Sequence, residues 1–359
     1  MNTVRWMGAV LLALPMLAWG QVSLLKMSAP ELATGGKVSY TLHAAQAGQL
    51  RLELLTGDGD VVRTLALPNA RAGQHEISWD GKDERGQAVP DEAYCARVVL
   101  EAQGKRSTDD PCARTGGEVI KGIQPALAPG DDIAYTLDRP ARVLIRVGVK
   151  NGAMFRSLSV WRPRPAGRNL QRWSGFDDSG LVDLRNDRLA LLVTAFRLPD
   201  FTVITTGQDG LEYRSWRTAQ GWPERPDGPT SDATAQALER NGERVARQHY
   251  MARYKDREPR ITVTLLDGAG KPLADGQSLP DELRVSVDLH PEDRWLMQEQ
   301  LYEVAFFVNG DFVSEEENGY VPIGWIWSTA AMKPGRHLLT VNLTGFTGRV
   351  GTKTISVSK

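Results

Sequence analysis

The sequence predicts an all-β protein built from tandem sandwich modules. Short segments of alternating apolar and polar residues recur along most of the chain, turn residues separate them, and a set of positions repeats after about 95 residues. Alternation with a period of two is typical of half-buried strands, and regular spacing by turns is typical of sandwiches. The composition, with 41% hydrophobic and 24% charged residues, is that of ordinary globular domains.

The first 20 residues have the order of a secretory signal peptide. Arg5 gives a positive start, residues 7–17 form an apolar core, and Ala18 and Gly20 are small residues before a cleavage site. The apolar run is shorter than the roughly 20 residues of a membrane span, so an uncleaved anchor is the less favoured alternative. We expect cleavage near Gly20/Gln21, a periplasmic or extracellular location and no transmembrane segment after cleavage.

The charge balance of the mature chain is close to neutral. With Arg5 removed from the 43 Lys and Arg residues, 42 basic side chains face 44 acidic ones, and the net charge is about −2. A protein that binds the nucleic-acid backbone needs an excess of Lys and Arg. The sequence therefore predicts no nucleic-acid partner.

The chain has two cysteines, Cys95 and Cys112. Thiols that are close in sequence usually pair in an oxidising compartment. Tyr94, Ala96 and Val98 form the inward phase of an alternating segment, which turns Cys95 outward toward the following loop. We predict a disulfide between Cys95 and Cys112, worth roughly 3 kcal/mol for a loop of this length. A metal site or a catalytic thiol is the alternative, and neither has nearby histidine ligands or a base.

An internal repeat organises the first two hundred residues. Residues 38–42 (VSYTL) recur as residues 133–137 (IAYTL), an offset of 95. Two copies of one sandwich domain explain a constant period of this size. We expect Trp79 and Trp173, which occupy matched positions, to be core residues. The other matched features are GDVVRTL at 59–65 with GAMFRSL at 152–158, Ala72-Gly73 with Ala166-Gly167, Gly81 with Gly175, and Gly86 with Gly180.

Residues 66–100 resemble the Ig-like domain of the flagellar hook-capping protein FlgD and its relatives in exported proteins. The features that carry this resemblance are Ala72-Gly73, Trp79-Asp80-Gly81, Gly86, Val89-Pro90 and Tyr94. Glu92 stands where the family usually has glycine, and Ser174 replaces the aspartate that follows the tryptophan in the second copy. The resemblance implies an Ig-like sandwich for residues 21–104 and a second, degenerate one for residues 117–206. It implies no particular function, because the same module occurs in many unrelated proteins. The signal peptide argues against a true hook cap.

Residues 207–258 are predicted to be a linker with a helix. The segment from Gly221 to Pro229 excludes regular structure, and Thr230 or Ser231 then caps a helix that runs to about Lys255. Arg240, Arg244, Arg247 and Arg253 make this helix basic. An anionic partner is one interpretation, and a solvated polar face is the favoured one. Alternation returns in residues 259–359, which predicts a third and different Ig-like sandwich.

The sequence shows no catalytic motif. We predict no enzymatic activity, no cofactor and no metal. The five histidines are scattered, and turn chemistry explains acidic pairs such as Asp58 and Asp60. Trp325 and Trp327 would share one face of a strand. Together with Tyr320 they are a candidate platform for stacking on a sugar ring, although burial in a core is favoured.

These observations predict a non-catalytic exported cell-envelope protein with a structural or scaffold role, whose Ig-like modules bind protein partners. The alternative is a carbohydrate-binding surface protein in which Trp325 and Trp327 contact a glycan. An enzyme with a site assembled from distant residues is a third, weaker hypothesis.

Overall fold

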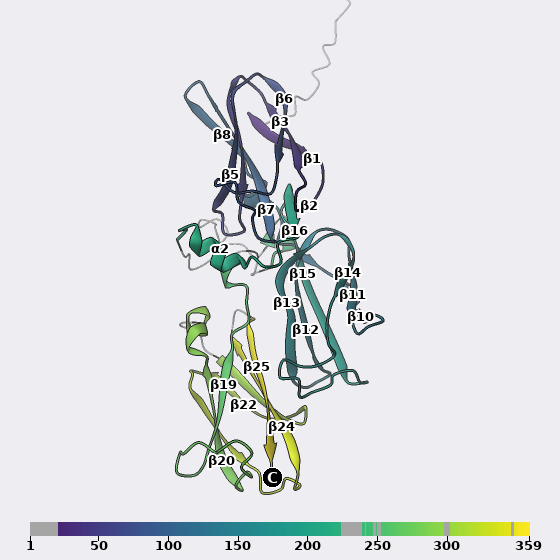
Figure 1. The fold of residues 1–359 in the computed structure, drawn as a ribbon, viewed down its shortest axis with the longest axis vertical. Helices are drawn as coiled ribbons and strands as arrows, with labels where there is room; N and C mark the ends of the chain where they lie inside the picture. Colours follow the sequence, from purple (N-terminus) through teal and green to yellow (C-terminus); the bar gives the residue numbers. More distant parts are fainter. Residues whose placement is uncertain are drawn as a thin grey trace, which may run out of the picture.

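The computed structural model describes residues 21–223, 239–240, 242–246, 249, 253–297, 302–345 and 348–359. The predicted signal peptide, residues 1–20, lies outside the described residues. The fold is all-β, as predicted, and consists of sandwich modules (Figure 1). Figure 1 shows the first module in purple and blue at the top, the second in teal at its lower right, and the third in green and yellow at the bottom.

The first module packs the three-stranded sheet β1-β3-β6 against a larger sheet in the order β2-β16-β7-β4-β5, with β8 also paired to β7. Alternation in β7 places Tyr94, Ala96 and Val98 in the core, as predicted. A short helix, α1, follows β8 and is capped by Asp110. The elements are β1 (Val22–Met27), β2 (Glu31–Ala33), β3 (Val38–Ala44), β4 (Gly48–Leu55), β5 (Val61–Ala70), β6 (Gly73–Trp79), β7 (Ala93–Ala102), β8 (Lys105–Asp109) and α1 (Pro111–Arg114).

The second module packs the sheet β10-β11-β14 against the sheet β13-β12-β15-β9. Trp79 and Trp173 are buried in the first and second cores, so the predicted core role of both is confirmed. Each indole donates to the carbonyl three residues later, Trp79 to Lys82 at 2.8 Å and Trp173 to Phe176 at 2.9 Å. The strands are β9 (Val119–Ile120), β10 (Ala126–Leu127), β11 (Ile133–Leu137), β12 (Ala141–Val149), β13 (Met154–Arg164), β14 (Gly167–Gln171) and β15 (Leu189–Arg197).

The strand β16 (Thr202–Thr206) differs from the expected domain boundary. We expected residues up to 206 in the second module, but β16 pairs with β7 and β2 of the first. Val203 packs in the first core, whereas Ile204 packs with Ala93 and Leu198 on the other face of the sheet. A strand with both faces apolar is stable between two neighbours. The chain therefore returns to the first module after completing the second.

The third module packs the sheet β19-β20-β23 against β22-β21-β24-β25, and its predicted alternation is confirmed. Val285 of β20 and Val304 of β21, for example, are both fully buried in its core. The elements are β19 (Ile261–Leu266), β20 (Glu282–Leu289), η3 (Pro291–Leu296), β21 (Tyr302–Val308), β22 (Asp311–Gly319), β23 (Ile323–Ser328), β24 (Arg336–Gly345) and β25 (Val350–Ser358).

The linker contains a helix, but not where we predicted one. The helix α2 (Tyr213–Ala219) precedes the proline-rich segment and is capped by the Glu212 carboxylate. Most of the predicted helix, from residue 230 to 255, lies outside the described residues. Those described there form a hairpin of β17 (Glu239–Arg240) and β18 (Glu243–Arg244), with Gly242 at a positive φ of 79°, and the 3-10 turn η2 (Arg253–Lys255). Glycine adopts this turn conformation without strain, whereas it weakens a helix.

Candidate functional site: the junction of the three modules

Two aspartates in the β4–β5 turn of the first module form the base of the junction. Asp58 and Asp60 are buried, and both backbone N–H groups donate to the Thr56 hydroxyl, at 3.2 Å and 3.1 Å. This turn geometry satisfies the backbone within the turn. The two carboxylates are left to interact with the linker.

Arg217 of α2 binds both of these carboxylates. Its Nε lies 3.3 Å from Asp58 Oδ2, and its Nη2 lies 2.9 Å from Asp60 Oδ2. The Tyr213 hydroxyl donates to Asp58 Oδ2 at 2.6 Å, and the backbone N–H of Arg253 donates to Asp58 Oδ1 at 2.6 Å. The linker is therefore attached to the first module by charge-assisted hydrogen bonds, which are stronger than neutral ones.

A second buried ion pair joins the first module to the second. Arg142, on β12, places Nη2 2.6 Å from Glu92 Oε1, and each side chain is 5% exposed. Its Nη1 donates to the Trp161 carbonyl at 3.0 Å and lies 3.9 Å from Asp256 Oδ2. Asp256 also pairs with Arg253 at 3.2 Å. Removing one partner of such a buried pair leaves an uncompensated charge, which costs about 3 to 5 kcal/mol.

Burial shifts the ionisation of several junction groups. It raises the pKa of Asp256 to about 6, against the opposing effect of Arg253 and Arg142. Burial, with Asp58 next, raises the pKa of the Tyr213 hydroxyl well above its usual value. Burial, with the Arg253 charge next, lowers the pKa of His249 to about 3, so this imidazole is neutral at neutral pH. The junction contains the three guanidiniums of Arg142, Arg217 and Arg253. They face four carboxylates, those of Asp58, Asp60, Glu92 and Asp256, of which Asp256 has the raised pKa.

The third module is joined to the second by polar and apolar contacts. Glu258 accepts hydrogen bonds from Arg146 Nε at 3.0 Å, from the Ser157 hydroxyl at 2.9 Å and from the Val350 backbone N–H at 2.8 Å. The Asn342 side chain exchanges two hydrogen bonds with the Met154 backbone, at 2.8 Å and 2.7 Å. Phe307 of β21 packs into the core of the second module. All three modules thus share buried contacts.

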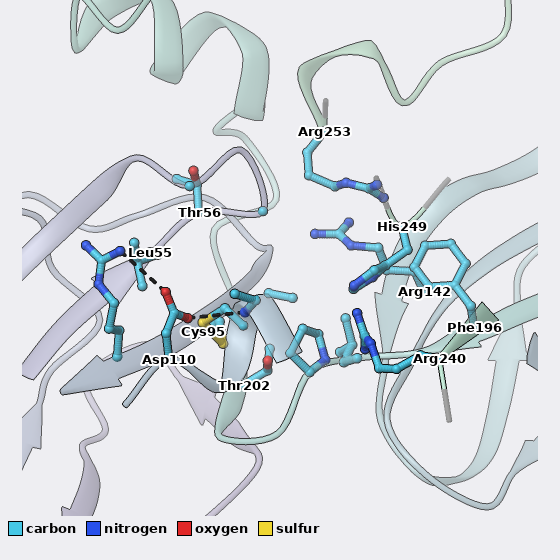
Figure 2. A pocket seen from close by; sticks show the side chains of 18 residues that line it. Leu55, Thr56, Cys95, Asp110, Arg142, Phe196, Thr202, Arg240, His249 and Arg253 are labelled. Carbon is cyan, nitrogen blue, oxygen red and sulfur yellow. Dashed lines mark hydrogen bonds and ion pairs between the residues drawn. A yellow bond between two sulfur atoms is a disulfide. The ribbon is translucent and has the colours of Figure 1, made fainter. Parts of the chain in front are cut away.

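A cavity of about 300 Å³ lies beside the Glu92–Arg142 pair, between the first and second modules (Figure 2). Arg142, Arg240, His249 and Arg253 line one side of it, and Cys95 and Asp110 line another (Figure 2). Arg97, which pairs with Asp110 at 3.5 Å, and Cys112 also belong to the wall. The Phe196 and His249 rings meet edge to face, with ring centres 5.9 Å apart. The wall therefore combines four guanidiniums, of which Arg97, Arg142 and Arg253 are paired with carboxylates, with the Asp110 carboxylate and apolar surface.

The predicted disulfide is present. The sulfur atoms of Cys95 and Cys112 are bonded, and the bridge connects β7 to α1. It belongs to the wall of the cavity.

Trp325 and Trp327 lie in a core, as the favoured interpretation of these residues predicts, and do not form the alternative, an exposed stacking platform. The two side chains are 9% and 4% exposed and stack on each other inside the third core, with ring centres 5.5 Å apart. Trp325 also stacks on Phe306 at 4.5 Å. Tyr320 is 67% exposed and outside that core. Because both indoles are buried, they offer no exposed ring face on which a sugar could stack.

The junction carboxylates of Asp58, Asp60 and Glu92 are each held by a guanidinium. Within the described part of the chain, no group of three or more His, Cys, Asp or Glu side chains is placed to hold a metal ion. In that same part, no helix is long and apolar enough to cross a membrane.

The sequence interpretation missed the junction. It assigned Asp58 and Asp60 to turn chemistry and Arg253 to a solvated face, yet all three are buried. A signal was present in α2, where Arg217 adjoins Tyr213 and Trp216 on the apolar side of the helix. A charged residue on an apolar helix face needs a buried partner of opposite charge.

The fold and the junction define a multi-module β-sandwich protein whose modules are joined by buried ion pairs. Residues 29–104 match the family model of the FlgD Ig-like domain, so the first module is a FlgD-like Ig-like domain. The basal-body rod modification protein FlgD of Salmonella typhimurium is 39% identical over 54 residues, which are 15% of this chain and 23% of that protein. The chain thus spans about a quarter of the length of the curated relatives it matches.

Two solved structures of FlgD are also similar. FlgD from Xanthomonas campestris is 16% identical and has a TM-score of 0.21, with 33% of this chain and 80% of that chain covered. FlgD from P. aeruginosa is 15% identical and has a TM-score of 0.22, with 40% and 95% covered.

Proposed function

We propose that this protein is an exported, non-catalytic component of the cell envelope that holds three Ig-like sandwiches in one arrangement and presents their edges to protein partners. The observation that carries the proposal is the buried junction. Asp58 and Glu92 of the first module are bound by Tyr213 of the linker and by Arg142 of the second module. Glu258 of the linker is bound by Arg146 of the second module. A protein that only tethered independent modules would need no such contacts, because exposed linkers suffice. A fixed arrangement suits a scaffold.

The edge strand β22 is the surface that best fits a protein partner. It ends the sheet β22-β21-β24-β25, and Phe312 and Val313 on it are 52% and 43% exposed. An edge strand carries unpaired backbone groups that can add a strand from another chain. Exposed apolar side chains at such an edge increase the area that a partner would bury.

Export is supported by the order of residues 1–20 and by the disulfide, since paired thiols are typical of oxidising compartments. Intact-mass measurement of the protein recovered from the producing cells tests this part. We expect a mature chain that begins at or near Gln21. Retention of residues 1–20 would contradict it.

Crosslinking in the producing cell tests the scaffold role. A photo-reactive amino acid replaces Phe312 on the edge strand β22, and a matched variant carries it at Arg284, which is exposed on the inner strand β20. We expect a discrete protein adduct at position 312 and none at 284. Equal adducts at both positions, or none at either, would contradict the assignment of β22 as the binding edge.

A further inference from the structure

The cavity at the junction has the dimensions of a ligand site. Its volume of about 300 Å³ is at the lower end of the range for small-molecule pockets, about 300 to 1,000 Å³. It is lined by residues from both modules and from the linker, including Thr56, Arg142 and Arg240. Pockets of bound molecules are often found between domains.

Arg240 is the least compensated cation on its wall. Arg142 and Arg253 are paired with buried carboxylates, and Arg97 binds Glu53 at 2.6 Å. Arg240 donates to the Gly116 carbonyl at 2.6 Å, and its ion pair is with Glu118 at 4.0 Å. Glu118 is itself shared with Arg197, at 3.5 Å. A guanidinium with five donors and one distant, shared carboxylate attracts an anion.

A buried hydroxyl on the same wall has no hydrogen-bond partner among the described residues. Thr202 is 5% exposed, and its Oγ1 is unpartnered. Figure 2 shows Thr202 at the cavity wall, between Cys95 and Arg240. A buried polar group without a partner is costly, and it calls for an explanation such as a bound molecule.

The rest of the wall is apolar. Leu55, Ala93, Phe196, Leu198 and Pro199 contribute hydrocarbon surface to it, and Phe196 lies beside Arg240 in Figure 2. A small inorganic anion would leave this surface in contact with water. A molecule with one anionic end and an apolar body would cover both kinds of wall.

We propose that this cavity binds a small organic monocarboxylate, with the carboxylate against the Arg240 guanidinium, the Thr202 hydroxyl as a further donor, and the hydrocarbon part against Phe196 and Leu198. This goes beyond the scaffold function, which requires no ligand. Binding here would bridge the first module, the second module and the β17–β18 hairpin. It would therefore stabilise their arrangement by mass action.

Calorimetric titration of the mature chain with hexanoate, octanoate and benzoate tests the proposal, with hexanamide and inorganic phosphate as the neutral and inorganic comparisons. We expect saturable binding of at least one carboxylate and weaker binding of hexanamide and phosphate. Arg240→Gln should weaken binding by about 10-fold or more, the effect of losing a charge-assisted hydrogen bond. Thr202→Val should weaken it by a few-fold while keeping the side-chain shape.

Arg244→Gln is the matched control, because Arg244 is exposed on the adjacent strand of the same hairpin and is not part of the cavity. It should bind as the unmodified protein does. Equal affinity in the Arg240→Gln and Arg244→Gln variants would overturn the proposal, as would phosphate binding as tight as that of the carboxylates. Absence of heat with all three carboxylates up to about 10 mM, well above the dissociation constant of a specific site, would overturn it too.

Discussion

Glu92 of the first module and Arg142 of the second form an ion pair of 2.6 Å in which both side chains are almost completely buried. Glu92 also stands where the FlgD-like pattern usually has glycine. The departure from the pattern therefore coincides with a contact that the isolated module does not need. Glu92 thus attaches the first module to the second.

Glu92→Gln should destabilise the protein by about 3 to 5 kcal/mol, because Arg142 would remain buried without its main partner. Adding Arg142→Met should recover a large part of this loss, since the orphaned charge is then removed. Chemical denaturation of the two single variants and the double variant measures the coupling. Asp138→Asn is the control, because the Asp138–Arg139 pair is exposed, 57% and 53%, and such pairs contribute less than about 1 kcal/mol. Equal losses for Glu92→Gln and Asp138→Asn would contradict the account.

The buried Asp256 carboxyl should make stability fall as pH rises from about 4 to about 6. Its pKa is raised from 3.8 to about 6 in the folded state, so the folded protein binds the proton more tightly than the unfolded chain. Stability from this proton is present below pH 4 and lost as pH rises through 6, by up to about 3 kcal/mol. His249 acts in the opposite direction, because its lowered pKa costs stability as pH falls below 6.5.

The difference in unfolding free energy between the unmodified protein and Asp256→Asn isolates the aspartate from His249. We expect this difference to shift in favour of the variant as pH rises from 4 to 6. Denaturant titrations at several pH values in this window provide the measurement. A difference that does not change with pH would show that the Asp256 pKa is not raised.

Trp79→Ala and Trp173→Ala should each cost about 3 to 5 kcal/mol, the usual cost of truncating a buried aromatic residue. Trp79 is fully buried and contacts Tyr94 with ring centres 5.5 Å apart, and Trp173 is 7% exposed. Calorimetry should show that each variant lowers the transition of its own module first. Leu192→Ala, at a position that is 54% exposed, should leave the profile unchanged. If either tryptophan variant melts like the Leu192 variant, that tryptophan is not a core residue.

Unreduced, unfolded protein should show no free thiol, because Cys95 and Cys112 are bonded. Reduction should then lower stability by about 3 kcal/mol, because the bridge joins two cysteines 17 positions apart and so closes a loop in the unfolded chain. Thiol labelling followed by mass spectrometry measures the first point, and denaturation with and without reductant measures the second. Labelling of both cysteines before reduction would refute the bridge.

Sequence alone predicted the features that depend on local pattern. Alternation placed Tyr94 and Val285 in cores, and the repeat placed Trp79 and Trp173 at matched positions. Both features could be predicted because the strand period and the turn type depend on neighbouring residues. The features it missed depend on contacts between distant segments. The Asp58 carboxylate accepts a hydrogen bond from the backbone N–H of Arg253, 195 residues away in the sequence, and the residues around these two positions do not predict that contact.

The same reasoning explains the domain boundary at β16 and the burial of Trp325 and Trp327. The residues of β16 (Thr202–Thr206) pair with β7 of the first module. The alternation of apolar residues predicts a strand but does not specify its partner strand. Trp325 and Trp327 share a face, as expected, but only the opposing Phe306 decides whether that face is open. Pattern predicts which residues share a face, and packing decides what covers it.

Small-angle X-ray scattering tests most directly whether the buried junction holds the three modules in one arrangement. We expect the scattering of the mature protein to fit the single arrangement in Figure 1, and the double variant Glu92→Gln, Arg217→Met to have a larger radius of gyration while its modules remain folded by circular dichroism. Scattering from the unmodified protein that fits only a broad set of module orientations, and that the variant leaves unchanged, would contradict the account.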